Sequence, residues 1–131
     1  MRRRPEIFVL VLCADGVAEL VADALKAAIP RRRPHDHALV AEPHTHSFPS
    51  GHATTSFACA TLLAAAVPRL RVPLYVLATA IAWSRVYVGV HYPLDVLAGA
   101  ALGLAVGVLV LRALPRLARG RRRSRRTPRS S

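Results

Sequence analysis

An apolar segment in the C-terminal half of the chain, from residue 93 to about residue 114, restricts the fold more than any other feature. No charged or polar side chain interrupts it between Val96 and Leu111, and Arg112 follows directly. A helix needs roughly 20 mainly apolar residues to cross a bilayer. Because proline suits the first turn of a helix, we expect a membrane-spanning helix that begins at Pro93.

Glycines recur every four residues along this expected helix, at Gly99, Gly103 and Gly107. That spacing places them on one face, where small residues allow a second helix to approach closely. Glycines scattered by chance in an Ala- and Gly-rich helix are the alternative explanation. We expect a packing face.

The composition of the whole chain agrees with a membrane protein. Hydrophobic residues make up 53% of the 131 residues although the net charge is +12, a combination that is rare in soluble basic proteins. Further helices are expected over about residues 7–28, 50–67 and 73–88. We therefore predict one all-α integral membrane bundle of about four transmembrane helices at residues 1–118. A basic, disordered cytoplasmic tail at residues 119–131 is expected to follow it.

The first of these helices is the weakest candidate for a span. Asp15, Glu19 and Asp23 recur every four residues and form one acidic stripe. An acid in mid-membrane costs about 2.5–3.5 kcal/mol on insertion scales, so the stripe should face protein, water or the interface. Asp23 is three residues from Lys26 and can pair with it. The helix either spans the membrane or lies partly in its interface.

Basic residues indicate the orientation, because cytoplasmic loops carry an excess of Lys and Arg. They occur at both ends of the chain and after the second helix: Arg2-Arg3-Arg4, Arg69 with Arg71, and Arg112 with Arg121-Arg122-Arg123. We expect a multi-pass protein of the plasma membrane with both termini in the cytoplasm. Residues 26–52 and 84–95 then share the extracytoplasmic face. Arg31-Arg32-Arg33 violate the rule there, and we interpret them as attracting an anionic substrate.

The last cluster on that face has the elements of a histidine nucleophile. His91 and Asp95 are four residues apart, so the carboxylate can reach one imidazole nitrogen and leave the other free to attack. Arg85, near the outer end of the third helix, matches phosphate oxygens bidentately. This spacing predicts phosphoryl transfer through His91.

Pro49-Ser50-Gly51-His52 opens the second helix, and a helix N-terminus favours a phosphate. Ser50 can cap the helix and donate its hydroxyl, and Gly51 lets an oxygen approach the backbone. His52 is suited to donate a proton to a leaving group. Lys26 and Arg33 add two cations from the end of the first helix and the following loop.

Taken together, these clusters resemble the signature of the type 2 phosphatidic acid phosphatase superfamily, which includes lipid phosphatases and vanadium haloperoxidases. Three stretches carry the resemblance in order: Lys26-Ala-Ala-Ile-Pro-Arg-Arg-Arg33-Pro34, Pro49-Ser50-Gly51-His52, and Ser84-Arg85-Val-Tyr-Val-Gly-Val-His91-Tyr-Pro-Leu-Asp95. The resemblance covers roughly residues 14–111. It implies a lipid phosphate substrate and neither a metal nor another cofactor.

The resemblance also implies a role for each matching residue. His91 attacks phosphorus and forms a phosphohistidine, Asp95 orients it, and His52 protonates the leaving oxygen. A set of donors stabilises the equatorial oxygens: Lys26, Arg33, Ser50, Gly51 and Arg85. Water then hydrolyses the phosphoenzyme.

A polyprenyl diphosphate is the first expectation for the substrate, with phosphatidic acid or phosphatidylglycerol phosphate as alternatives. Nothing in the sequence identifies the lipid tail. Typical membrane members have six spans, so this chain is a minimal member, is truncated at its start, or assembles with a second copy. A non-catalytic membrane subunit is one rival function. A vanadium haloperoxidase is the other, although those relatives are larger and soluble.

Three other features have plainer interpretations. Four histidines between the first two motifs suit the lining of a site entrance better than a metal site: His35, His37, His44 and His46. The Arg-rich C-terminus suits a topology anchor near anionic lipid and not nucleic-acid binding. Cys13 and Cys59 lie in apolar stretches and are expected to be free, buried thiols.

Overall fold

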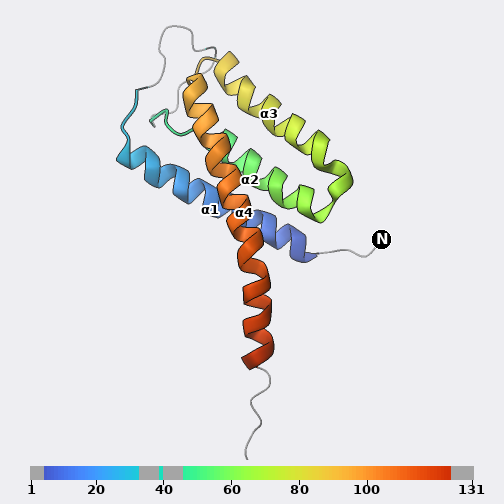
Figure 1. Ribbon diagram of the computed structural model, residues 1–131. Coiled ribbons are helices and arrows are strands. Elements are labelled where there is room, and N and C mark those ends of the chain that lie inside the picture. The colour runs from blue at the N-terminus through green and yellow to red at the C-terminus, as the bar shows by residue number, and fades with distance from the viewer. Residues whose placement is uncertain (1–4, 33–38, 40–45, 125–131) are drawn as a thin grey trace, which may run out of the picture.

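A computed structural model describes residues 5–32, 39 and 46–124, and all regular secondary structure in them is helical. Four α-helices and one 3₁₀ turn follow in order: α1 Pro5–Ala28, α2 Gly51–Ala66, η1 Pro68–Leu70, α3 Arg71–Tyr87 and α4 Pro93–Ser124 (Figure 1). The predicted all-α fold with four helices is confirmed.

Two helix boundaries differ from the expectation. Helix α3 begins at Arg71 and not at Pro73, because a proline within the first helical turn lacks only an N–H that has no partner there. Helix α4 continues to Ser124, about ten residues beyond its expected end, and extends well past the other helices (Figure 1). It thus overlaps the start of the predicted basic tail, and residues 125–131 lie outside the described part of the chain.

Helix α2 is at the centre of the bundle and packs against α1, α3 and α4. Its contact with α4 uses the predicted glycine face. A Cβ on Gly99 would lie 2.6 Å from the Ser50 carbonyl oxygen, one on Gly103 would collide with the Thr54 carbonyl oxygen, and one on Gly107 would lie 2.7 Å from Cβ of Thr61. The glycines therefore allow the two backbones to touch, and the packing face is confirmed.

Small residues fill the interior of the bundle, whereas large apolar residues cover its exterior. The buried core is mostly alanine: Ala14, Ala18, Ala22, Ala53, Ala58, Ala60, Ala64, Ala78 and Ala82. Phe8, Leu20, Val72, Trp83 and Leu97 are each more than half exposed. Water disfavours such an exterior, whereas lipid accommodates it and close helix packing in lipid uses small residues.

One helix of the described chain is both long and apolar enough to cross a membrane, over Pro93–Ala113. On α1, Glu19 and Asp23 are exposed and Asp15 is half-buried. Asp23 accepts a hydrogen bond from Nζ of Lys26 at 2.8 Å, which confirms the predicted pair. Spanning by α1, α2 and α3 stays a prediction.

A glycine turn joins α3 to α4. Gly89 has φ of 78°, a left-handed conformation that glycine adopts without a Cβ penalty. The N–H of Gly89 bonds to the carbonyl of Val86 and that of Val90 to the carbonyl of Arg85, which is the Schellman pattern of a helix end. Because Val90 is fully buried, this turn fixes the path of the chain into His91.

Candidate active site

The predicted clusters meet at one end of the bundle. Helices α2 and α4 both begin there, and the N–H of Ser50 donates to the Asp95 carbonyl at 3.0 Å. The ends of α1 and α3 bring Lys26 and Arg85 to the same region. Two helix N-termini with their positive dipole ends therefore lie side by side, which favours an anion between them.

His91 and Asp95 are buried, with 5% and 0% of their surface exposed. Nδ1 of His91 lies 3.8 Å from Oδ2 of Asp95, close enough for an ion pair but longer than a hydrogen bond. The same Oδ2 accepts the N–H of Tyr92 at 2.9 Å, half of a capping box at the start of α4. Asp95 therefore both caps the helix and faces the imidazole.

Arg31 binds the other carboxylate oxygen of Asp95. Its Nη1 lies 2.9 Å from Oδ1, and its guanidinium lies over the ring of Tyr92, 4.7 Å from the centroid. We expected Arg31 only as one of three arginines that attract an anion. The sequence contains no spacing signal for this pair, because the partners are 64 residues apart.

Oγ of Ser50 and Nε of Arg85 are buried and have no hydrogen-bond partner in the described part of the chain. Leaving such a group unpaired costs about 1–3 kcal/mol. The expectation that the Ser50 side chain caps α2 is wrong, because its hydroxyl makes no capping bond although Ser50 stands at the N-cap. Both groups are thereby left to bind a ligand.

The remaining predicted residues surround this centre. Nζ of Lys26 would lie 3.5 Å from a Cβ on Gly51, so the ammonium reaches the start of α2. His52 is exposed on the first turn of that helix. The structure thus brings seven predicted residues to one end of the bundle: Lys26, Ser50, Gly51, His52, Arg85, His91 and Asp95. Arg33, the eighth, lies outside the described residues.

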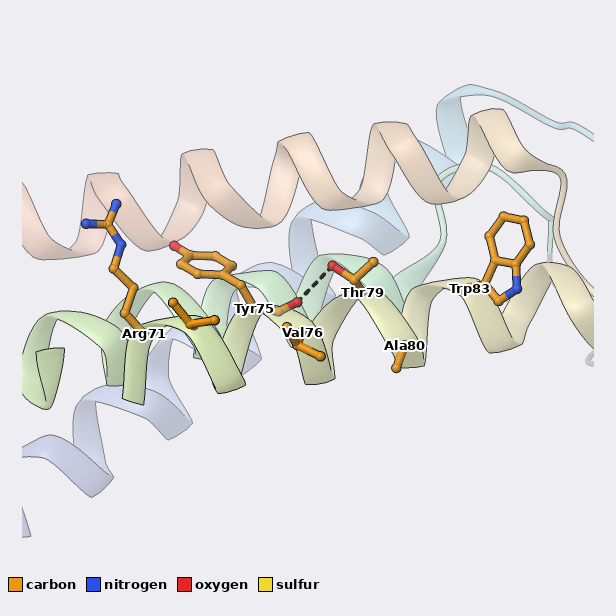
Figure 2. A pocket seen from close by; sticks show the side chains of 7 residues that line it. Arg71, Tyr75, Val76, Thr79, Ala80 and Trp83 are labelled. Carbon is orange, nitrogen blue, oxygen red and sulfur yellow. Dashed lines mark hydrogen bonds between the residues drawn. The ribbon is translucent and has the colours of Figure 1, made fainter. Parts of the chain in front are cut away.

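Other candidate sites show different chemistry. The described residues contain no cluster of three or more His, Cys, Asp or Glu that could hold a metal, and His35, His37 and His44 lie outside them. Cys13 and Cys59 are free as expected, but the prediction that both are buried is wrong, because Cys13 is exposed and Cys59 is half-buried. A hollow of about 630 Å³ runs along one face of α3 from Arg71 to Trp83 (Figure 2). Its lining is almost entirely apolar, with Arg71 at one end, so it is suited to a hydrocarbon chain.

Several curated proteins with similar sequences are named as phosphatases. A family model described as the PAP2 superfamily matches residues 7–119. Decaprenylphosphoryl-5-phosphoribose phosphatase of Mycobacterium tuberculosis is 42% identical over 113 residues, which cover 83% of this chain and 62% of that protein. This chain therefore spans less than two thirds of the length of that curated relative.

Two solved structures are similar. One is a transmembrane PAP2-type phosphatidylglycerolphosphate phosphatase of Bacillus subtilis, with a TM-score of 0.67 and 35% identity, covering 82% of this chain and 59% of that one. The other is LpxE of Aquifex aeolicus, with a TM-score of 0.74 and 31% identity, covering 83% of this chain and 69% of that one. With a family match over residues 7–119 that includes every predicted site residue, the chain belongs to the PAP2 superfamily.

Proposed function

We propose that this protein is a membrane lipid phosphatase that hydrolyses a phosphate monoester or diphosphate through a phosphohistidine on His91. The observation that carries the proposal is the placement of buried His91 and Asp95 beside the unpartnered hydroxyl of Ser50, where two helix N-termini meet. An anion is the ligand that such a site accommodates. The names of the relatives agree with a phosphate ester.

In the proposed reaction, Nε2 of His91 attacks phosphorus while the bond to the leaving oxygen breaks. His52 gives a proton to that oxygen, and its exposed position allows the proton to be replaced from water. Water then attacks the phosphohistidine, which releases inorganic phosphate and restores His91. A set of donors stabilises the charge on the three equatorial oxygens: Lys26, Arg33, Ser50, Gly51 and Arg85.

A polyprenyl-linked phosphate is the proposed substrate. The M. tuberculosis relative is named for a decaprenyl-linked phosphate, and a relative from Sulfolobus acidocaldarius, 32% identical, is named undecaprenyl-diphosphatase. The apolar hollow on α3 and the apolar exterior agree with a substrate delivered from the bilayer. Phosphatidylglycerol phosphate is the second candidate, because one structural neighbour is named for it.

The site is proposed to face the extracytoplasmic side, with both termini in the cytoplasm. The arginines of the short connection after α2 support this orientation. Arg69 lies on η1 and Arg71 is the first residue of α3, at the end of the bundle opposite to His91. Basic residues in a short connection favour the cytoplasmic side.

The test is phosphate release by the purified full chain in detergent with a chelator present. The substrates are undecaprenyl diphosphate, a polyprenyl phosphosugar and phosphatidylglycerol phosphate. We expect activity on a polyprenyl substrate and its loss to background in His91→Ala. A substrate with a good leaving group, p-nitrophenyl phosphate, needs less acid catalysis, so His52→Ala should be impaired much more on the lipid, by about 10²–10⁴-fold.

A control is Leu109→Ala, on the exterior of α4 well beyond Asp95, which should keep full activity because its side chain is largely exposed and far along the helix from the site. Full activity of His91→Ala would refute the mechanism. Preference for phosphatidylglycerol phosphate would replace the polyprenyl substrate and leave the chemistry intact.

A further inference from the structure

Arg31 lies in the loop after α1, and its backbone is tied to the segment that precedes the second motif. Its N–H donates to the carbonyl of Ile29 at 2.8 Å, and its own carbonyl accepts the N–H of Ser47 at 3.0 Å. Ser47 is fully buried, and its hydroxyl donates to the carbonyls of Arg31 and Arg32. The guanidinium of Arg31 therefore extends from a fixed point of the backbone.

The side chain of Arg31 reaches a carboxylate that has 0% of its surface exposed, while its own is 37% exposed. A buried carboxylate needs a charged or strongly bonding partner on each oxygen. The N–H of Tyr92 donates a hydrogen bond to Oδ2 of Asp95, and Nη1 of Arg31 donates one to Oδ1. The guanidinium makes a cation–π contact with the ring of Tyr92, an arrangement that favours Arg over Lys.

The cap alone does not set the plane of this carboxylate. The terminal torsion of an aspartate is broad, so one hydrogen bond to Oδ2 leaves the group free to turn about that contact. The bond from Arg31 to Oδ1 fixes the second point. With both oxygens held, Oδ2 stays 3.8 Å from Nδ1 of His91, from where a small movement forms the hydrogen bond that orients the imidazole.

We propose that Arg31 is a positioning residue that holds Asp95 in the orientation required to align His91. This inference rests on the proposed function, since it assigns a part in the same reaction. Arg31 acts through Asp95 and not on the phosphate, which distinguishes it from Arg33. Its loss should lower kcat and leave KM nearly unchanged.

The test compares Arg31→Gln with Arg69→Gln, which makes the same change of charge at an exposed residue of η1, at the opposite end of the bundle. We expect kcat to fall about 10–100-fold in Arg31→Gln, by analogy with groups that orient metal-binding side chains, and less than two-fold in Arg69→Gln. Arg31→Lys should recover part of the loss, because an ammonium can still reach Oδ1.

A double-mutant cycle separates positioning from general support of the fold. If Arg31 acts through Asp95, Arg31→Gln should have almost no further effect in an Asp95→Asn background. Additive losses, a rise in KM at constant kcat, or full activity of Arg31→Gln would each overturn the inference. If Arg31→Gln does not fold, the same cycle is measured with Arg31→Lys. Its effect on kcat should then also nearly vanish in the Asp95→Asn background. An inactive wild type would instead refute the proposed function.

Discussion

The seam between α2 and α4 and the polar cluster at its end are built in opposite ways. In the seam, the face of Gly99, Gly103 and Gly107 lies directly on the α2 backbone, with no space for a side chain. In the cluster, long side chains from distant parts of the chain meet, as Arg31 and Asp95 do. The seam depends on the absence of side chains and the cluster on their presence.

This difference assigns separate tasks to the two regions. The seam sets how α2 and α4 lie against each other, and so where both helices begin. Because Ser50 and Asp95 stand at those beginnings and are bonded through the backbone, the seam also sets the width of the candidate site. Stability should therefore depend most on the glycines, and activity on the charges.

The largest effect on folding is expected from Gly103→Leu. A side chain there collides with the backbone of Thr54, and overpacking a tight contact costs about 1–3 kcal/mol or more. Gly16→Leu is the matched control, because nothing lies within 4 Å of a Cβ on Gly16. Thermal unfolding in detergent should show a much lower Tm only for Gly103→Leu, and equal Tm values would contradict the role of the seam.

A smaller effect is expected from Gly89→Ala, at the turn between the two regions. The left-handed backbone at φ 78° costs about 1–2 kcal/mol for a residue with a Cβ. Asn tolerates this conformation better than Ala, so Gly89→Asn should be closer to the wild type. Phosphate release should fall together with Tm, because His91 follows two residues later. If Ala were tolerated as well as Asn in both measurements, the turn would not position His91.

The smallest effect is expected from Asp23→Asn, which alters only a charge at the edge of the cluster. Asp23 competes with a phosphate for the ammonium of Lys26, and such an exposed pair is worth about 0.2–1 kcal/mol. We expect unchanged Tm and a KM lowered about two- to five-fold. Glu19→Gln makes the same change of charge one turn away and should leave KM unchanged. A higher KM in Asp23→Asn would contradict the proposed role of Lys26 in phosphate binding.

Most of the fold could be predicted from the sequence, because it depends on local patterns. The apolar run after Pro93 and the four-residue glycine spacing specify a helix and its packing face without knowledge of the partner. The end of α4 was misjudged, since the apolar pattern stops near residue 114 while the helix continues to Ser124. Basic residues such as arginine are themselves good helix formers.

The candidate site could be predicted only where residues are close in sequence or match a known motif. His91 and Asp95 are four apart, and their proximity followed from helix geometry. Arg31 binds Asp95 across 64 residues, a contact that depends on how α1 and the following loop fold back over α4. The unpaired hydroxyl of Ser50 was missed for a related reason, because serine at the N-cap ordinarily caps the helix.

The most direct test of the account is to trap the phosphoenzyme. The purified chain is mixed briefly with a polyprenyl substrate that carries labelled phosphate, denatured in alkali, and digested. We predict that the label is stable in alkali and labile in acid, as expected of a phosphohistidine, lies on the peptide with His91, and disappears in His91→Ala. Label on Ser50 or His52, or hydrolysis that proceeds at full rate in His91→Ala, would contradict the account.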